Sequence, residues 1–186
     1  MRIEHIWQML FRGGFFPAQR ILTSAIAAID IALWDILGKA LNVPVYQLLG
    51  GKVRDKVVCY PHNVGHGMDV QSLVDSCLQT KEEGWKFVRW GLPQDGDILE
   101  PRQAVLASIK QFHAVREAVG DEIELTFDVH TRLDLPDVVW LCREIESTRP
   151  FFIEDPLRCE NPDSFKTLRP RVHVPISAGE QFSSKW

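Results

Sequence analysis

Three acidic residues recur at a constant interval in the second half of the chain. Glu154 follows Asp128 by 26 residues, and Glu180 follows Glu154 by another 26. Each acid closes an apolar run that looks like a strand, namely LTFD, FFIE and ISAGE. If the fold brought them together without a basic partner, the carboxylates would repel one another and take up protons unless they shared a divalent cation. Ligation by oxygen alone suits Mg²⁺, which keeps its other positions for water and substrate.

A regular alternation of strand and helix patterns surrounds these acids. Strand patterns cover 56–61, 86–92, 123–129, 151–154 and 174–178, and helix patterns cover 70–83, 101–119, 135–147 and a short stretch after Asn161-Pro162. This order predicts a parallel sheet, either closed as a (β/α) barrel or open and doubly wound. An open sheet of the nucleotide-binding kind should carry a glycine-rich phosphate loop. Because neither G-x-G-x-x-G nor G-x-x-x-x-G-K occurs, the barrel is favoured.

The interval between the acids fits such a barrel. One βα unit takes roughly 30 residues, so a step of 26 returns each acid to the same rim, one strand further round. Asp128, Glu154 and Glu180 are therefore predicted to bind Mg²⁺ at the C-terminal mouth of the strands. Any one of them alone could be a solvated loop residue, and their common phase favours the metal site. Asp155, next to Glu154, should point to the other side of its strand.

Composition and charge exclude several classes of function. The chain has 186 residues, of which 45% are hydrophobic, enough to bury the core of one domain or of one domain plus part of another. Its formal charge is -4, and its Lys and Arg residues are scattered, so neither nucleic acid nor an anionic membrane surface is expected as a partner. The four cysteines show no C-x-x-C spacing, which predicts reduced thiols in a cytoplasmic protein.

The N-terminal part of the chain has a different pattern. Residues 23–41 predict a helix that is apolar nearly all round and hence buried on several sides. Its apolar run contains Asp30, Asp35 and Lys39, so no membrane span is predicted, and the N-terminus lacks the order of a signal peptide. The turn-rich segment that follows contains Gly50-Gly51, which is the predicted boundary between domains 1–50 and 51–186.

Together these stretches resemble a known family. AIDIALWDILGKALNVPVYQLLGG and the acids in FDVH, FFIEDP and SAGEQ are similar to the enolase superfamily, in its mandelate racemase and muconate lactonizing enzyme branch. The resemblance implies a TIM-type barrel preceded by an N-terminal capping domain, with Mg²⁺ held by Asp128, Glu154 and Glu180. In that family the metal binds the carboxylate of an acid substrate and stabilises the enediolate formed when the α-proton is removed.

Two further positions indicate the subgroup. His130 lies two residues beyond Asp128, so on an extended strand end its side chain would share the metal's side, although a single histidine can also be structural. This D-x-H arrangement resembles sugar-acid dehydratases of the galactonate and mannonate type, in which such a histidine helps the β-hydroxyl leave as water. Where racemases of the branch carry K-x-K, this chain has Arg89-Trp90-Gly91. Gly91 cannot act as a base, which favours dehydration over racemisation.

Four other polar residues are candidates for substrate binding. Arg89 could present its charge to the substrate or pair with a nearby acid, and Arg132 could bind the substrate or form an ion pair within its loop. His62 lies in the loop after the first predicted barrel strand, as does His66, and both could instead be solvated loop residues.

The resulting hypothesis is a Mg²⁺-dependent dehydratase, a lyase, acting on a sugar acid (aldonate) in the cytoplasm, and functioning as a homo-oligomer. A racemase or cycloisomerase of the same branch is one alternative, and a catalytically silent fragment or scaffold is another. The chain is expected to be truncated at both ends, with about five βα units and only the helical part of the capping domain. Because no general base is found in it, the isolated chain is expected to be inactive.

Overall fold

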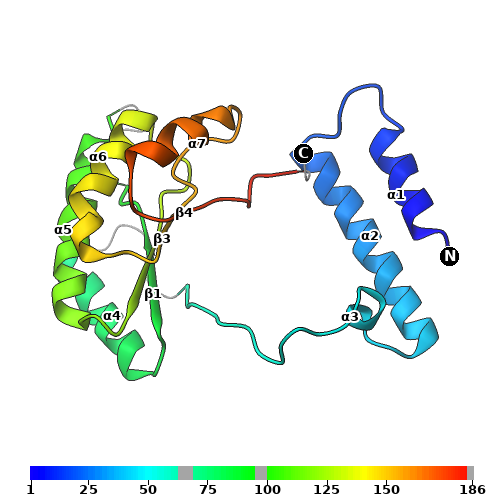
Figure 1. The fold of residues 1–186 in the computed structure, drawn as a ribbon, viewed down its shortest axis with the longest axis horizontal. Helices are drawn as coiled ribbons and strands as arrows, with labels where there is room; N and C mark the ends of the chain where they lie inside the picture. The colour runs from blue at the N-terminus through cyan, green and yellow to red at the C-terminus, as the bar shows by residue number, and fades with distance from the viewer. Residues whose placement is uncertain (63–68, 95–99, 184–186) are drawn as a thin grey trace. The chain divides into compact units, whose positions relative to one another are not determined.

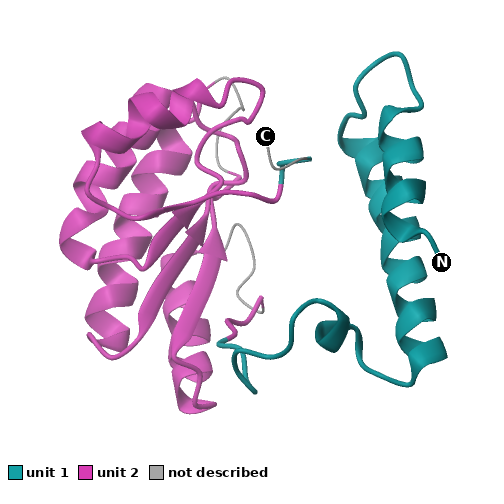
Figure 2. Cartoon of the chain, turned by 45° about the vertical axis from the view of Figure 1, so that its right-hand side comes forward, with its two compact units in different colours: residues 1–58, 181–186 teal, residues 59–180 magenta. Residues whose placement is uncertain are grey.

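The computed structural model describes residues 1–62, 69–94 and 100–183. The chain divides into two compact units (Figure 2). Unit 1 comprises Met1–Val58 with Gln181–Trp186, and unit 2 comprises Cys59–Glu180. Each unit is built around its own elements.

Unit 2 contains a parallel sheet in which every strand pairs with its neighbour in the chain. The strands are β1 Phe87–Gly91, β2 Glu124–Asp128, β3 Phe152–Glu154 and β4 Ile176–Ser177, in the order β1-β2-β3-β4 (Figure 1). Asp128 is the register partner of both Gly91 on one side and Glu154 on the other. The carboxyl ends of β1, β2 and β3 therefore lie level with one another.

The helices of unit 2 follow the predicted pattern closely. They are α4 Val70–Glu82, α5 Arg102–Val119, α6 Leu135–Ile145 and α7 Asp163–Leu168, with short 3₁₀ turns η1 Glu146–Thr148 and η2 Arg169–Arg171. Asp69 begins α4, because its carboxylate accepts the backbone N–H groups of Gln71 and Ser72. Gly120 follows α5 at φ 74°, a conformation that suits glycine. Helices α4, α5 and α6 lie along one face of the sheet (Figure 1).

The core lies between this sheet face and the helices. Val88 and Trp90 of β1 and Phe127 of β2 are buried, and the rings of Trp90 and Phe127 both contact Phe112 of α5, at centroid distances of 4.7 and 5.0 Å. Side chains alternate along a strand, so the residues between these core positions point to the opposite face. That second set includes Arg89, Thr126, Asp128 and Glu154.

The strand predicted over 56–61 is not present, so the described part of the chain has four strands and not five. Val57 and Val58 are 76% and 72% exposed. Their apolar, β-branched character favours an extended conformation, but a strand also needs a neighbouring backbone to pair with. In the described part of the chain the sheet consists of β1, β2, β3 and β4 and does not include this segment.

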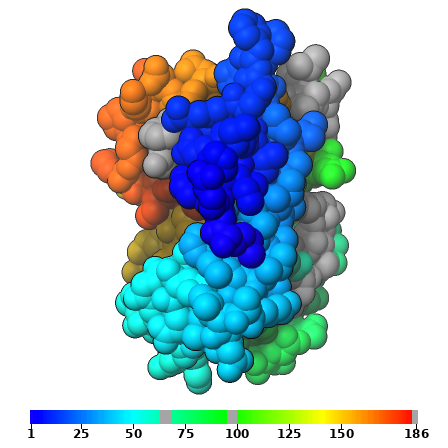
Figure 3. All heavy atoms as spheres, turned by 90° about the vertical axis from the view of Figure 1, so that its right-hand side faces the viewer, coloured from blue at the N-terminus to red at the C-terminus, as the bar shows by residue number. Residues whose placement is uncertain are grey.

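Unit 1 consists of α1 Ile3–Arg12, α2 Arg20–Leu41 and α3 Val45–Leu48. Helix α2 contains the predicted helix 23–41, but the expectation that it would be buried on several sides is wrong. Only Ile26 and Gly38 are buried, and the exposed apolar residues include Ile21, Leu22, Ile29, Ile31, Ile36 and Leu41. Figure 3 shows in blue shades the surface that α1 and α2 form. Two helices of 10 and 4 residues cover too little of a 22-residue helix that is apolar nearly all round.

The length and composition of α2 would also allow it to cross a membrane. Buried core helices pass the same test, and α2 contains the charged residues Asp30 and Asp35. That no segment spans a membrane therefore stays a prediction.

Candidate active site at the carboxyl end of the sheet

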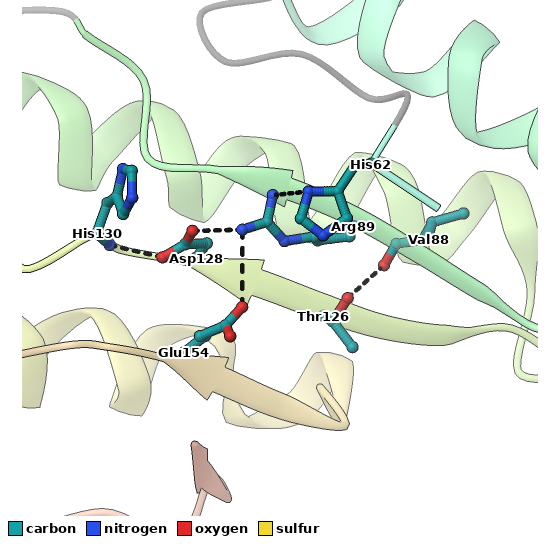
Figure 4. Close-up of polar contacts among 7 residues, drawn as sticks. All are labelled: His62, Val88, Arg89, Thr126, Asp128, His130 and Glu154. Carbon is teal, nitrogen blue, oxygen red and sulfur yellow. Dashed lines mark hydrogen bonds and ion pairs between the residues drawn. The ribbon is translucent and has the colours of Figure 1, made fainter. Parts of the chain in front are cut away.

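Two of the predicted metal ligands meet at the carboxyl ends of β2 and β3 (Figure 4). Asp128 and Glu154 are register partners on adjacent strands, and both lie on the sheet face away from the helices. The Asp128 side chain is 3% exposed and that of Glu154 is 19% exposed. Two carboxylates are thus held side by side in a largely buried position.

Arg89 of β1 lies between these carboxylates. Its Nη2 donates a short hydrogen bond to Asp128 Oδ2 and lies 3.7 Å from Glu154 Oε2. Its Nη1 lies 3.3 Å from His62 Nδ1 (Figure 4). Arg89 therefore pairs with acids, the simpler of its two expected roles, and it also brings His62 to the site.

The charges in this cluster are not balanced. Burial raises the pKa of Glu154, and the negative charge of Asp128 raises it further, while Arg89 lowers it. Glu154 Oε2 has no hydrogen-bond partner in the described part of the chain, because 3.7 Å from Arg89 is too long for a hydrogen bond. Arg89 Nε also lacks such a partner there. One guanidinium therefore faces two carboxylates, and it leaves Glu154 Oε2 and its own Nε without a hydrogen-bond partner in the described part of the chain.

The third predicted ligand, Glu180, lies beyond the end of β4 in an exposed loop. Its negative charge raises the pKa of both Glu154 and Asp155, so it acts on the same region. Within the described residues, however, no three His, Cys, Asp or Glu side chains lie close enough together to hold a metal ion. The complete ligand set of Asp128, Glu154 and Glu180 therefore stays a prediction.

His130 reaches the site through its backbone. Strand β2 ends at Asp128, and His130 and Thr131 follow with φ 56° and 62°, so the assumption that His130 continues an extended strand is wrong. The chain turns there because Asp128 Oδ1 accepts the His130 backbone N–H at 2.8 Å, as aspartate does in tight turns. In Figure 4 this backbone contact, and not the imidazole, joins His130 to Asp128. The catalytic role of the ring stays a prediction.

Arg132 contacts the backbone and does not form the loop ion pair considered for it among the described residues, and its contact with a substrate stays a prediction. Its Nη1 donates to the carbonyl oxygens of Leu92 and Pro93, at 3.3 and 2.9 Å. It thus connects the turn after β2 to the segment after β1, and no ion pair with an acid is found for it among the described residues. The other loop candidate, His66, lies outside the described residues.

Comparison with known proteins places this chain in a family. Residues 72–186 match the model of the enolase C-terminal domain-like family, and residues 1–50 match the N-terminal domain of mandelate racemase and muconate lactonizing enzyme. The chain belongs to the mandelate racemase and muconate lactonizing enzyme family of the enolase superfamily.

Individual relatives cover 95–100% of this chain, whereas the chain covers only about half of each relative. A D-galactonate dehydratase of Pectobacterium atrosepticum is 42% identical over 185 residues, which is 100% of this chain and 48% of the relative. The crystal structure of an enolase from Pantoea ananatis with bound D-gluconate and Mg is 30% identical, with a TM-score of 0.86 over 98% of this chain and 51% of the other. That of the 3,6-anhydro-D-galactonate cycloisomerase from Zobellia galactanivorans is 31% identical, with a TM-score of 0.79 over 95% and 47%. The chain thus spans about half the length of these family members.

Tyr60 is a residue of the site that the sequence analysis missed. Its ring stacks on His62 at 5.5 Å and meets Phe152 edge-on at 6.2 Å. Burial raises the pKa of its hydroxyl, and the charge of Glu154 raises it further. The available signal was the Tyr-x-His spacing, because alternate residues of an extended segment lie on the same side.

Asp155 is a second residue near the site, to which the sequence analysis gave no role there because it was expected to point to the other side of its strand. It is 3% exposed with φ 39°, and burial, then Asp128 and Glu180, raise its pKa. Its carbonyl accepts the Thr131 N–H at 2.8 Å, and its carboxylate accepts the N–H of Gly179. Asp155 thus joins the turn that carries His130 to the loop that carries Glu180. The signal for it was a second acid directly after a buried apolar run.

The chemistry of this donor set fits Mg²⁺. Asp128 and Glu154 supply carboxylate oxygens, the donors that this small, hard cation prefers. Glu154 Oε2 is buried without a hydrogen bond from the described residues, and the pKa of Glu154 is raised, so the site favours additional positive charge. Arg89 now provides part of that charge.

Proposed function

We propose that this chain is part of a Mg²⁺-dependent sugar-acid dehydratase that acts on an aldonate. The observation that carries the proposal is the pairing of Asp128 with Glu154 at level strand ends, with the turn of His130 built on Asp128. The 42% identity to a D-galactonate dehydratase supports the choice of sugar acids as the substrate class.

The residues take the following proposed roles. Asp128, Glu154 and Glu180 hold Mg²⁺, which when bound would neutralise the carboxylate of the substrate. His130 gives a proton to the β-hydroxyl of the substrate, so that it leaves as water. Arg89 and His62 lie on the same sheet face and would contact the substrate, as would Arg132 if its present contacts with backbone carbonyls were exchanged.

The general base must come from elsewhere. In β1 the position two residues after Arg89 is Gly91, and a guanidinium does not accept a proton near neutral pH. We therefore propose that the 186-residue chain binds Mg²⁺ but does not turn over sugar acids by itself. Loss of the α-proton and the β-hydroxyl as water would leave a 2-keto-3-deoxy acid as product.

We also propose that this enzyme is a cytoplasmic homo-oligomer. None of the four cysteines, all of which lie in the described part of the chain, forms a disulfide bond, and burial raises the pKa of Cys77 and Cys142 to about 12, which suits reduced core thiols in the cytoplasm. The exposed apolar residues of α2 favour association into a homo-oligomer over exposure to water. We assign α2 to the N-terminal domain and not to a membrane, because residues 1–50 match that domain.

A cycloisomerase is the second candidate, because a cycloisomerase structure of the family is 31% identical to the chain. Cycloisomerisation also begins with an acid-sugar substrate but releases no water. Product analysis therefore separates the two candidates.

The test is Mg²⁺ binding measured by calorimetry, followed by product analysis. Glu154→Gln should weaken Mg²⁺ binding by at least about tenfold, because it removes one charge from the ligand set. Glu160→Gln, the same change at an exposed acid outside the site, should leave the affinity unchanged. Equal binding by wild type and Glu154→Gln would reject the site. The full-length enzyme should convert a hexonate in a panel to a 2-keto-3-deoxy acid.

A further inference from the structure

The carboxylate pair already contains a cation that belongs to the chain. The Arg89 side chain is 11% exposed and approaches the pair from β1, the neighbouring strand. Its Nη2 contacts Asp128 Oδ2 and is also the atom that lies 3.7 Å from Glu154 Oε2. This nitrogen therefore occupies the position from which one cation can reach both carboxylates (Figure 4).

The two oxygens of Asp128 both have donors. Oδ1 accepts a hydrogen bond from the His130 backbone N–H at 2.8 Å, and Oδ2 accepts one from Arg89 Nη2. The His130 contact belongs to the backbone turn, so it cannot be exchanged without refolding that turn. The guanidinium sits at the end of a long side chain and can move away. A metal ion that bridges Asp128 and Glu154 would thus replace Arg89 and leave His130 in place.

Charge leads to the same conclusion. A divalent ion and a guanidinium a few ångströms apart repel strongly, and burial reduces the screening by water. Two carboxylates without any cation would repel as well, and Arg89 Nη2 is placed to contact Asp128 while lying 3.7 Å from Glu154 Oε2. The site therefore suits one cation at a time at the bridging position.

We propose that Arg89 is a built-in counter-ion that holds the carboxylate pair in the metal-free protein and that Mg²⁺ must displace. On displacement the guanidinium turns towards His62, whose Nδ1 is already 3.3 Å from Nη1. The inference rests on the proposed function only in taking Asp128 and Glu154 as metal ligands. It adds that the metal affinity of the site is set by competition with a residue of the chain.

The first test compares Mg²⁺ affinities by calorimetry. Arg89→Met should bind Mg²⁺ at least about tenfold more tightly than wild type, because the competing charge is gone. Arg89→Lys keeps the charge and should stay within about threefold of wild type. Arg158→Met removes an exposed guanidinium elsewhere in unit 2 and should change nothing. Weaker binding by Arg89→Met would overturn the inference, since Arg89 would then help to orient Asp128 for the metal.

A second measurement covers the case in which Arg89→Met folds poorly. In EDTA this variant should unfold at a lower temperature than wild type, and saturating Mg²⁺ should reduce or remove that difference. If it folds in neither condition, the ¹⁵N signal of the Arg89 guanidinium in wild type decides, with Arg89→Lys identifying the signal by its loss. Addition of Mg²⁺ should shift that signal, and an unchanged signal at saturation would overturn the inference.

The outcomes separate this inference from the proposed function. Binding by wild type that weakens in Arg89→Met rejects the counter-ion and retains the metal site. Binding by Arg89→Met but not by wild type supports the competition in its strongest form. Absence of binding in both, with both folded, rejects the metal site itself.

Discussion

Arg89 and Arg116 lie at opposite ends of the same sheet and bind very different partners. At the amino end, Arg116 of α5 donates to four backbone carbonyls: to Thr148 and Arg149 before β3, and to Gly120 and Ile123 before β2. At the carboxyl end, Arg89 contacts two carboxylates and a histidine, and its Nε has no partner among the described residues.

These partners indicate that Arg116 stabilises the fold, whereas Arg89 belongs to the candidate site. Arg116 satisfies carbonyl oxygens that the ends of secondary-structure elements leave without donors, so its contacts complete the fold. Arg89 holds charges that another cation or a ligand could hold instead. In (β/α) barrels the carboxyl ends of the strands carry the active site and the amino ends contribute to stability, and the two arginines follow that division.

Removal of Arg116 should have the largest effect on stability. Arg116→Met leaves several partly buried carbonyl oxygens without a donor and should lower the free energy of unfolding by about 2–4 kcal/mol. Urea denaturation measures this change. Mg²⁺ affinity of the folded variant should equal that of wild type, whereas a changed affinity would show that the two ends are coupled. Arg143→Met, at an exposed position of α6, serves as the control.

Substitution of Asp155, at the carboxyl end of the sheet, should lower the stability by less than substitution of Arg116. Asp155→Ala removes the acceptor for the Gly179 N–H and places alanine at φ 39°, so it should cost about 1–3 kcal/mol of stability. It should also weaken Mg²⁺ binding, because the loop of Glu180 loses its anchor. Asp155→Asn keeps an acceptor oxygen and tolerates the left-handed conformation, so it should retain most of both properties. If the two variants bind Mg²⁺ equally well, Asp155 does not position that loop.

The smallest expected effect concerns how the free energy of unfolding depends on pH, because acids at the two ends of the sheet should contribute with opposite signs. Burial raises the pKa of Glu154, so the folded state binds more protons than the unfolded state just above the ordinary pKa of glutamate. As the pH rises through that window in EDTA, wild type should lose stability relative to Glu154→Gln.

Asp121 at the amino end should show the opposite sign. The hydrogen bond from Arg149, and then its charge, lower the pKa of Asp121. Its contribution is present above the ordinary pKa of aspartate and is lost as the pH falls through the lowered value. Wild type should therefore exceed Asp121→Asn in stability at neutral pH and lose that advantage in acid. Unfolding of the three proteins by urea across the pH range measures both effects.

Much of unit 2 could be predicted from the sequence because its signals are local. Helices α4, α5 and α6 have apolar residues at helical spacing and clear start and stop residues, and each lies within two residues of its predicted bounds. The prediction of a strand at 56–61 was wrong. Its apolar pattern indicates an extended conformation but does not determine whether another strand pairs with it. The burial of α2 was wrong for a related reason, since an apolar helix becomes buried only where other elements cover it.

The site was predicted in its residue types and only partly in its geometry. The repeated interval correctly predicted that Asp128 and Glu154 lie together. The strands β2 and β3 are parallel and paired in register, so residues at equivalent positions of successive βα units become neighbours. The turn at His130 could not be foreseen, because it depends on a hydrogen bond from its own backbone to Asp128. The contacts of Arg132, Tyr60 and Asp155 depend on which loops become neighbours, and the local patterns around Tyr60 and Asp155 indicate candidates but not those contacts.

The strand order β1-β2-β3-β4 also has a consequence for how the chain is made. A nascent chain emerges from its N-terminus, and in this order each new strand finds its partner already synthesised. Arg89 precedes Asp128 by 39 residues, and both precede Glu154. The guanidinium is therefore present before either carboxylate is synthesised, and the first acid can be neutralised as its strand docks. The negatively charged part of the site is assembled during synthesis around a cation that the chain supplies in advance.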